Sequence, residues 1–366
     1  MNKIKVCHIT EAGGGVQRHI NDINVYASNI DIEHCFIISP VRNNFVSKNN
    51  DVYHLKMNRE IGIYDLKSMF NLYKLIKKIN PDVIHCHSSK SGGLVRGIKL
   101  LGLLKRIKIV YSAHGFYFNE YSNKFKNLIY INIEKVLGFK TDIIVGTCNS
   151  EHKLVIDNKI ASEKKAIIIE NGIDTEAYKR LNKQLNPKAP VLLFVGRLSR
   201  QKNIKILLES LLALKNEIKD VRLIVIGDGE EMDDARAYCI QNNLMNNVTF
   251  EGFVSNLEPY MRKADIVVMP SLWEGFPYFL LESLIQGKPV VGGNVTGIKD
   301  VITPGLNGFL CDPSDSENLT NSIIECLESV ERKGLTTDNC ISSIKGKFEV
   351  TKMVNELEKT YITITN

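Results

Sequence analysis

The sequence predicts an α/β protein made of two doubly wound domains, and three observations lead to this prediction. The chain has 366 residues, about twice the usual length of one domain. Short apolar runs alternate with longer segments of helical period, and this alternation forms two blocks. The runs are apolar on both faces, which is typical of parallel strands covered by helices on both sides. Each block is therefore expected to form its own parallel sheet.

In the first block, candidate strands alternate with candidate helices. Strands are predicted at residues 4–10, 34–39, 83–87, 108–112 and 143–147. Helices are predicted at residues 16–28, 66–79, 92–101 and 126–137. This order is the βαβ alternation of a doubly wound sheet.

The second block repeats the pattern. Its strands are predicted at residues 190–195, 222–227, 248–250, 266–270 and 289–291, and its helices at 204–214, 232–241 and 278–286. A last amphipathic helix is expected from residue 345 to the end, because Phe348, Met353, Leu357 and Tyr361 follow a helical spacing.

A polar, proline-containing segment separates the two blocks. It follows a turn at Asn171-Gly172, and it predicts an N-terminal domain over 1–172, a linker over 173–189, a C-terminal domain over 190–344 and the final helix over 345–366. Ligands of open α/β sheets bind beyond the carboxyl ends of the strands. Two facing sheets would bring these ends to a shared cleft, which is the expected site.

Composition excludes several classes of protein. No apolar run approaches the ~18 residues that span a bilayer, and the first residues are too short and polar for a signal peptide. The eight cysteines show no CxxC spacing, and several lie inside apolar runs. These features favour a reducing, cytoplasmic location and give no support for a metal site.

Charge is distributed unevenly along the chain. Residues 1–180 contain 27 lysines and arginines against 17 acidic residues, whereas residues 181–366 contain 20 against 24. A basic N-terminal half suggests an anionic partner, either nucleic acid, a phosphorylated substrate or a membrane surface. A solubilising surface without a partner is equally compatible with the charge alone. Nucleic acid ranks low because the chain has no recognised binding module or aromatic platform.

A glycine-rich loop follows the first strand. Gly13, Gly14 and Gly15 lie directly before a helix, where the backbone can approach a ligand and free N–H groups can bind an anion. The loop lacks the dinucleotide spacing, which disfavours NAD. It is either a tight structural turn or a loop for a diphosphate or an acceptor.

The first strand of the second block ends in a basic loop. Arg197 and Lys202 lie between that strand and the next helix, where both could clamp a diphosphate. Solvated basic side chains are the alternative. The turn Gly227-Asp228-Gly229 after the next strand indicates close backbone packing, and it is also compatible with a nucleotide nearby.

The most specific pattern runs from Ser271 to Glu282. A strand leads to Glu274 in a Gly/Pro loop, and Glu282 follows about one turn inside the next helix. A carboxylate, helix N-terminal amides and a second carboxylate suit a sugar hydroxyl, a phosphate and a ribose diol. A solvated helix would explain isolated glutamates, but not this strand–loop–helix setting.

Histidines and basic residues mark the first block. His85 and His87 end one strand and His114 follows the next, where they are either structural or lie beside the cleft. His-x-His alone gives no third metal ligand at a sensible spacing. The segment 92–108 could be a membrane-binding face or a core helix with a solvated rim, and its basic residues are Arg96, Lys99, Lys105, Arg106 and Lys108.

Together these motifs resemble the retaining, nucleotide-sugar-dependent glycosyltransferases of family 4, which have the GT-B fold. The resemblance spans nearly the whole chain and adds Asn171-Gly172-Ile173-Asp174 to the motifs above. Gly-Gly-Val-Gln-Arg-His at 14–19 and His-Ser-Ser-Lys-Ser-Gly at 87–92 resemble bacterial capsule and surface-polysaccharide members.

The resemblance implies a role for each motif. Arg197 and Lys202 would bind the donor diphosphate, Glu282 the ribose, and His114 the donor sugar. Glu274 and the backbone of Gly275, Phe276, Pro277 and Tyr278 would hold the sugar, Phe253 and Val254 would border the base, and Gly14 and Gly15 would lie near the diphosphate and acceptor. The final helix would cross back to the first domain. Pro277 stands where many members have glycine, and residues 294–300 replace a commoner Gly-Gly-Ile-Pro-Glu-like loop.

The expected function is transfer of a hexose or N-acetylhexosamine from a UDP-sugar to a lipid-linked or oligosaccharide acceptor, with retention and without a metal or other cofactor. Front-face attack is expected, with the diphosphate taking the acceptor proton. The basic half would suit a polyprenyl-diphosphate acceptor at the inner face of the cell membrane. Two alternatives are a UDP-sugar 2-epimerase and a non-catalytic nucleotide-sugar-binding assembly protein. A dehydrogenase would need the absent dinucleotide fingerprint.

Overall fold

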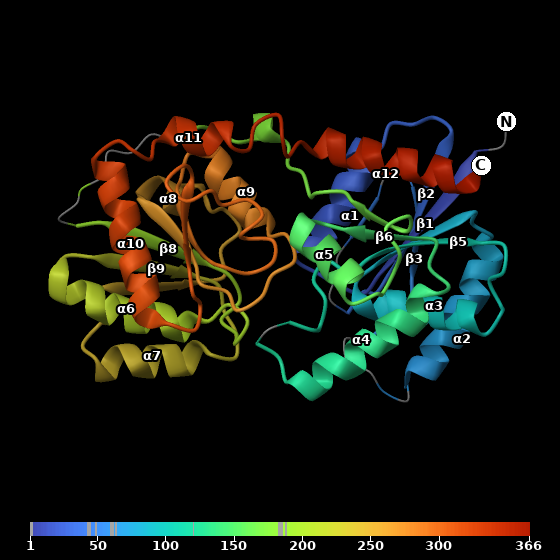
Figure 1. Cartoon of the computed structure of the whole chain (residues 1–366), viewed down its shortest axis with the longest axis horizontal. Helices are drawn as coiled ribbons and strands as arrows, with labels where there is room; N and C mark the ends of the chain where they lie inside the picture. Colours follow the sequence, from blue (N-terminus) through green and yellow to red (C-terminus); the bar gives the residue numbers. More distant parts are fainter. Residues whose placement is uncertain are drawn as a thin grey trace. The chain divides into compact units, whose positions relative to one another are not determined.

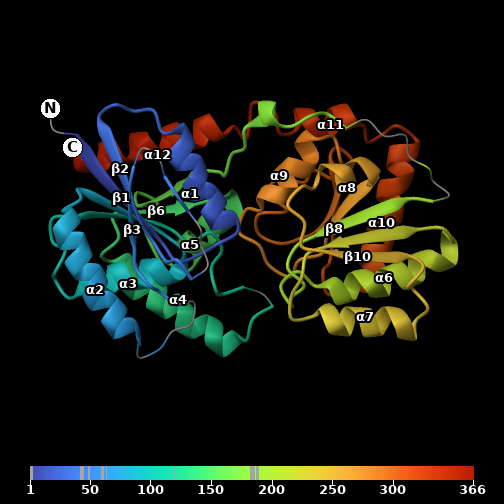
Figure 2. The ribbon, with the colours of Figure 1, turned by 180° about the vertical axis from the view of Figure 1, so that it is seen from behind.

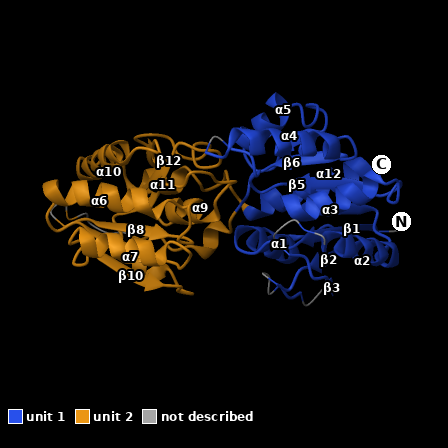
Figure 3. Cartoon of the chain, turned by 90° about the horizontal axis from the view of Figure 1, so that it is seen from below, with its two compact units in different colours: residues 1–172, 350–366 blue, residues 173–349 orange. Residues whose placement is uncertain are grey.

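The computed structural model describes residues 3–41, 45–47, 50–58, 62, 64–119, 121–181, 186 and 189–366. The chain divides into two compact units, which Figure 3 shows in different colours. The first unit holds residues 1–172 and 350–366, and the second holds residues 173–349. Each unit contains one parallel sheet with helices on both sides (Figures 1 and 2), which confirms the predicted fold class.

The first unit is built on a sheet with the strand order β3-β2-β1-β4-β5-β6-β7. Its strands are β1 (Ile4–Thr10), β2 (Ile32–Ile38), β3 (Asp51–His54), β4 (Val83–His87), β5 (Lys108–Ser112), β6 (Ile143–Gly146) and β7 (Ala166–Ile168). Its helices are α1 (Gly15–Tyr26), α2 (Tyr64–Ile79), α3 (Ser89–Leu100), α4 (Lys124–Gly138), α5 (Asn149–Asp157) and α12 (Val350–Thr365).

Alternating side chains divide the core of this unit between the two faces of the sheet. On one face Cys7 and Ile9 of β1 pack with apolar residues of α2 and α3. On the other face Val6 packs with Ile23 of α1 and Leu357 of α12. The C-terminal helix α12 therefore completes the core of the first unit, as the resemblance implied.

The second unit has a sheet with the order β10-β9-β8-β11-β12-β13. Its strands are β8 (Val191–Val195), β9 (Arg222–Ile226), β10 (Val248–Gly252), β11 (Ile266–Met269), β12 (Val290–Gly293) and β13 (Gly308–Cys311). Its helices are the short η1 (Thr175–Ala177), α6 (Ile204–Glu217), α7 (Met232–Gln241), α8 (Glu258–Lys263), α9 (Tyr278–Ile285), α10 (Ser316–Glu331) and α11 (Thr337–Ser342). In Figures 1 and 2, α6 and α7 lie on one side of the sheet and α8 and α9 on the other.

The chain passes between the units at 172–173 and again at 349–350, which differs from two predicted boundaries. Ile173 N donates to Phe348 O at 2.9 Å, so the segment expected as a linker belongs to the second unit from its first residue. The final helix begins at Val350 rather than at 345, and Gly346 before it adopts φ +77°. A positive φ breaks a right-handed helix, which explains the later start.

Candidate active site

In the second unit, the loops after β8 and β9 are packed backbone against backbone. A Cβ on Gly227 would lie 1.9 Å from Gly196 O, and one on Gly229 would lie 2.2 Å from Leu198 O. No side chain fits at these distances, so positions 227 and 229 must be glycine for the β8–α6 loop to follow its path. The turn thus positions the loop that carries Arg197 and Lys202.

The two basic side chains of that loop have different surroundings. The Arg197 guanidinium is paired with Glu230 Oε2 at 2.9 Å, and both side chains are 56% exposed. An exposed pair of this kind is weak, so an anionic ligand can replace Glu230. Lys202 Nζ lies 2.5 Å from Glu274 Oε1, and the Glu274 side chain is only 9% exposed. The structure therefore joins two residues that the sequence analysis selected separately.

Backbone contacts hold the Lys202 and Glu274 loops together. Leu272 N donates to Gln201 O at 2.8 Å, and Gln201 Nε2 donates to Trp273 O at 2.8 Å. Asn203 lies in the left-handed region with φ +57°, and its amide reaches Pro270 O at 3.2 Å. The loops at the carboxyl ends of the neighbouring strands β8 and β11 are therefore one connected structure.

The segment 275–278 leads from β11 into α9. Pro277 is the N-cap of α9, with φ −74° and ψ 122°, and no side chain caps the helix. The positive end of the helix dipole of α9 therefore lies at the end of this segment, where it favours an anionic or polar ligand. Gly297, at φ +81°, packs its Cα against Gly275: a Cβ there would be 1.7 Å from Gly275 O. The divergent loop 294–300 therefore supports this segment.

Glu282 lies in α9 and lines a cavity of about 300 Å³ within the second unit. Its Oε1 accepts a hydrogen bond from the Tyr178 hydroxyl at 2.7 Å. Residues 255–258, which directly follow Phe253 and Val254, also line this cavity. Phe253 itself is 86% exposed. Tyr178 was missed in the sequence because it falls in the segment expected to be a linker.

In the first unit, the predicted histidines belong to a larger buried cluster. His85 and His87 are at the end of β4, and His114 follows β5 with φ +53°. His87 Nδ1 and His114 Nε2 are 3.1 Å apart. Burial lowers the pKa of all three imidazoles well below the usual value, so they are neutral at pH 7.

Gly14 and Gly15 occupy the start of α1, as the sequence indicated. Gly14 has φ +61°, and nothing lies within 4 Å of the position of a Cβ there. Glycine is therefore needed for the backbone conformation and leaves open space above the helix start. No side chain caps α1 at Gly14.

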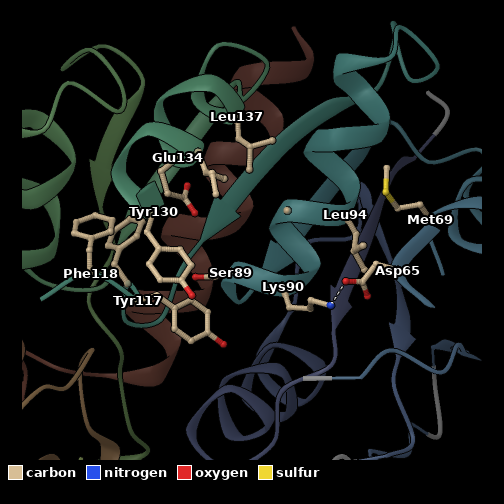
Figure 4. A pocket seen from close by; sticks show the side chains of 13 residues that line it. Asp65, Met69, Ser89, Lys90, Leu94, Tyr117, Phe118, Tyr130, Glu134 and Leu137 are labelled. Carbon is tan, nitrogen blue, oxygen red and sulfur yellow. Dashed lines mark hydrogen bonds and ion pairs between the residues drawn. The ribbon is translucent and has the colours of Figure 1, made fainter. Parts of the chain in front are cut away.

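The first unit also contains a cavity of about 720 Å³ that the sequence did not predict (Figure 4). Helices α2, α3 and α4 surround it together with residues 116–118. Its wall is mainly apolar and aromatic, and the aromatic residues are Phe116, Tyr117, Phe118 and Tyr130. Lys90 and Asp65 form an ion pair of 2.5 Å in its lining, which Figure 4 shows as a dashed line.

Comparison with known proteins shows the family of the chain. A Glycosyltransferase Family 4 model matches residues 13–177, and a Glycosyl transferases group 1 model matches residues 176–336. The chain belongs to the GT-B glycosyltransferases. The first match falls mainly in the first unit and the second in the second unit, so this glycosyltransferase has one family domain in each sheet.

Its relatives include enzymes of bacterial surface polysaccharides. A UDP-Gal:alpha-D-GlcNAc-diphosphoundecaprenol alpha-1,3-galactosyltransferase of Escherichia coli is 29% identical over 82% of this chain and 80% of its own length. The capsular polysaccharide biosynthesis glycosyltransferase CapM of Staphylococcus aureus is 27% identical over 86% of each chain.

Solved structures share the fold over the whole chain. Sucrose-phosphate synthase from Thermosynechococcus elongatus matches with a TM-score of 0.83 at 18% identity and covers 99% of each chain. HepE from Anabaena, solved in complex with UDP and glucose, matches with a TM-score of 0.77 at 19% identity, over 98% of this chain and 100% of its own.

Of the residues expected on a membrane-binding face, Arg96 is buried in this glycosyltransferase and Lys99 is half-buried and paired, so that expectation was wrong for them. Arg96 is fully buried and donates to both carboxylate oxygens of Glu134, at 2.8 and 3.2 Å. Lys99 Nζ is 2.7 Å from Asp142 Oδ2, and its side chain is 11% exposed. Both lie on α3, which packs against the sheet and α4. Lys105 and Arg106 are exposed, and Lys108 is half-buried.

None of the helices in the described part of the chain combines the length and apolar character needed to cross a bilayer. Helix α4 nevertheless carries a row of exposed apolar side chains beside the 720 Å³ cavity: Phe125, Leu128, Ile129, Ile133 and Val136. Ile133 also lines the cavity, so the row and the cavity are continuous.

Proposed function

We propose that this glycosyltransferase moves a hexose or N-acetylhexosamine from a UDP-sugar to a lipid-linked acceptor in surface-polysaccharide synthesis, with retention of the anomeric configuration. The observation that carries the proposal is the Lys202–Glu274 pair, held by connected loops beside Arg197. The diphosphoundecaprenol in the name of the Escherichia coli relative supports the choice of acceptor.

In this proposal the second unit binds the donor. Arg197 exchanges Glu230 for a diphosphate oxygen, and Lys202 shares its charge between Glu274 and the diphosphate. Because both cations stabilise the charge that develops on the departing UDP, they perform the work that a metal ion performs in other transferases. The transfer itself is therefore proposed to need no metal or other cofactor.

The sugar is assigned to the segment before α9, and the ribose to Glu282 inside this helix. Glu274 and the backbone of the segment from Gly275 to Tyr278 would bind the sugar, and Glu282 would bind the ribose. Retention follows if the acceptor hydroxyl attacks on the side from which UDP leaves and the diphosphate oxygen takes the proton. In this step the bond between the sugar and the UDP oxygen breaks and a bond to the acceptor oxygen forms. The proton of the acceptor hydroxyl leaves with UDP.

The acceptor is assigned to the first unit. The 720 Å³ cavity has the apolar wall and the size to receive part of a polyprenyl chain. The exposed apolar row of α4 is flanked by Lys124 and Lys126, which are also exposed. Apolar side chains with basic neighbours bind the surface of an anionic membrane. We therefore infer a peripheral position on the cytoplasmic face of the cell membrane, through α4 rather than α3.

The test is a donor panel of UDP-, GDP- and ADP-sugars, with a polyprenyl-diphosphate-linked sugar as acceptor and released nucleotide as the readout. We expect release from one UDP-sugar, a glycolipid product of retained configuration by NMR, and loss of both in Arg197→Ala/Lys202→Ala. Lys205→Ala is the matched control, because Lys205 is an exposed lysine in α6 that pairs only weakly with Glu209 at 3.9 Å.

Three outcomes would refute the proposal. Conversion of the UDP-sugar to an isomer without acceptor would indicate an epimerase. Binding of the donor with neither release nor conversion would indicate an assembly protein. Release that persists in the double variant would remove Arg197 and Lys202 from the mechanism.

A further inference from the structure

Six of the eight histidines of the chain gather in one buried cluster of the first unit. They come from five places along the sequence: His8 on β1, His19 on α1, His34 on β2, His85 and His87 on β4, and His114 after β5. The parallel register aligns them, because Val6 pairs with His34 and His8 pairs with His85. Their side chains lie on the sheet face that α1 and α12 cover.

Within this cluster, His19, His87 and His114 have the arrangement of metal ligands. One ring nitrogen from each lies within 4.8 Å of the other two. The nitrogens of His87 and His114 are 3.1 Å apart, and two nitrogen ligands of one tetrahedral Zn²⁺ are about 3.3 Å apart for bonds of about 2.05 Å. A neutral imidazole has a lone pair on one of its two ring nitrogens, and this lone pair can bind a cation.

Neighbouring groups fix which nitrogen carries the lone pair on His19. Its Nδ1 lies 3.1 Å from Asn171 Oδ1, which can only accept a hydrogen bond. Nδ1 therefore carries the hydrogen, and Nε2 is the nitrogen that can bind a cation. Metal-binding histidines in proteins are oriented in this way by a carbonyl or carboxylate on the other nitrogen.

A line of hydrogen bonds does the same for His87. Its Nε2 lies 3.1 Å from His8 Nδ1, and His8 Nε2 lies 2.9 Å from His34 Nδ1. His34 Nε2 in turn lies 3.5 Å from the buried carboxylate of Glu358, a charge contact rather than a hydrogen bond, which favours an N–H on that nitrogen. When every N–H in this line points toward the carboxylate, the lone pair of His87 is on Nδ1, beside His114. Three buried groups, His8, His34 and Glu358, thus orient one ligand.

A second triad, His8, His85 and His87, is less suited to a cation. Both nitrogens of His85 are already occupied, Nδ1 by the Tyr361 hydroxyl at 2.6 Å and Nε2 by Ser112 Oγ at 2.8 Å. His114, by contrast, is only half-buried, so the first triad can be reached from solvent. Its left-handed backbone, at φ +53°, is a strained conformation of the kind that functional sites retain.

We propose that His19, His87 and His114 bind a divalent cation of borderline softness, Zn²⁺ in the first place, with a fourth coordination position open beside His114. Neutral nitrogen ligands favour Zn²⁺ over Mg²⁺, which prefers oxygen. This site goes beyond the transfer reaction proposed above, whose diphosphate is bound by side chains of the second unit. The sequence alone could not show it, because no third ligand lies near His85-x-His87.

The test is direct binding of Zn²⁺ to the full chain, which requires neither donor nor acceptor. Metal-free protein is titrated with Zn²⁺ against a chromophoric chelator, and with Co²⁺ by visible absorption. We expect one equivalent per chain and a Co²⁺ spectrum of a four-coordinate nitrogen site without thiolate bands. His19→Asn and His114→Asn should each weaken Zn²⁺ binding at least about 100-fold, and Asn171→Leu by about 10- to 100-fold.

His54→Asn is the matched control, because His54 is exposed on the edge strand β3. It should bind Zn²⁺ as the unaltered chain does. Circular dichroism of each variant separates lost binding from lost folding, and two single ligand variants keep the test valid if one fails to fold. Absence of Zn²⁺ and Co²⁺ binding by the folded, unaltered chain would overturn the proposal. So would folded His19→Asn and His114→Asn variants that bind Zn²⁺ with the affinity of the unaltered chain.

Discussion

Replacing Arg96 by Met should strongly destabilise the first unit, although Arg96 belongs to a basic segment that suggests a surface. The guanidinium makes two hydrogen bonds to Glu134, one to Gly92 O at 2.9 Å, and stacks 3.6 Å from the centre of the Tyr111 ring. Met removes all of these and leaves the Glu134 carboxylate buried without its cation. Breaking a buried pair from one side costs about 3–5 kcal/mol.

The second partner provides a way to test the cause. Glu134→Leu alone should cost a similar amount, because it leaves Arg96 charged and buried. The double variant Arg96→Met/Glu134→Leu leaves neither charge, so its loss of stability should be smaller than the sum of the two by about 2–3 kcal/mol. Arg106→Met, at an exposed position of the same segment, should change stability by less than about 0.5 kcal/mol.

Urea unfolding can follow the two units separately. The single tryptophan, Trp273, lies in the second unit, so its fluorescence reports that unit, whereas far-ultraviolet circular dichroism reports both. The first-unit transition should move to lower urea in Arg96→Met, and the tryptophan transition should stay in place. A loss below about 1 kcal/mol, or two additive single losses, would show that Arg96 is not held by Glu134 as described.

Three further predictions address the other parts of the molecule. Gly297→Ala places a Cβ 1.7 Å from Gly275 O on a backbone with φ +81°. It should destabilise the second unit by at least about 2 kcal/mol, measured by tryptophan fluorescence in urea. An unchanged urea midpoint would contradict the packing. Burial lowers the pKa of His19 from 6.5 to about 4, so below pH 6.5 the unfolded chain binds more protons than the folded chain. The free energy of unfolding of the first unit should therefore be constant above pH 6.5 and decrease as the pH is lowered from 6.5 to 4. A flat pH profile of unfolding by circular dichroism would contradict this. Leu128→Glu should abolish most of the protein's flotation with anionic vesicles, whereas Ile240→Glu, at an exposed apolar position of α7, should leave it unchanged. Flotation of Leu128→Glu equal to that of the unaltered chain would exclude α4 as the membrane contact.

Much of the sheet was predictable because its strands are apolar on both faces. The predicted bounds of β1, β4 and β5 coincide with the structure, as does helix α7. The edge strand β3 was not predicted, because it is short and polar, and a strand of this kind has little apolar pattern. Arg96 shows the opposite difficulty: its partner Glu134 lies 38 residues away on another helix, so no local pattern separates it from a solvated arginine.

The site was predictable where its residues belong to one loop and hidden where they belong to several elements. Glu274 and Lys202 each carried a local signal of their own, a strand followed by a turn and a helix. The histidine cluster carried such a signal only at His85, His87 and His114, which lie at the ends of two strands. His8, His19 and His34 join the cluster from two other strands and a helix. Residues that a parallel sheet brings together are separated in sequence by whole βαβ units.

The departures from the family pattern around α9 are better explained by backbone geometry than by loss of function. Pro277 has φ −74° at the N-cap of α9, a conformation that proline favours, so the freedom of glycine is not required there. Proline does remove one backbone N–H at this position, so the N–H groups of α9 begin at Tyr278. Gly297 keeps the neighbouring loop in contact with Gly275 despite its different sequence. The different sequence at 277 and 294–300 is therefore compatible with formation of the loop.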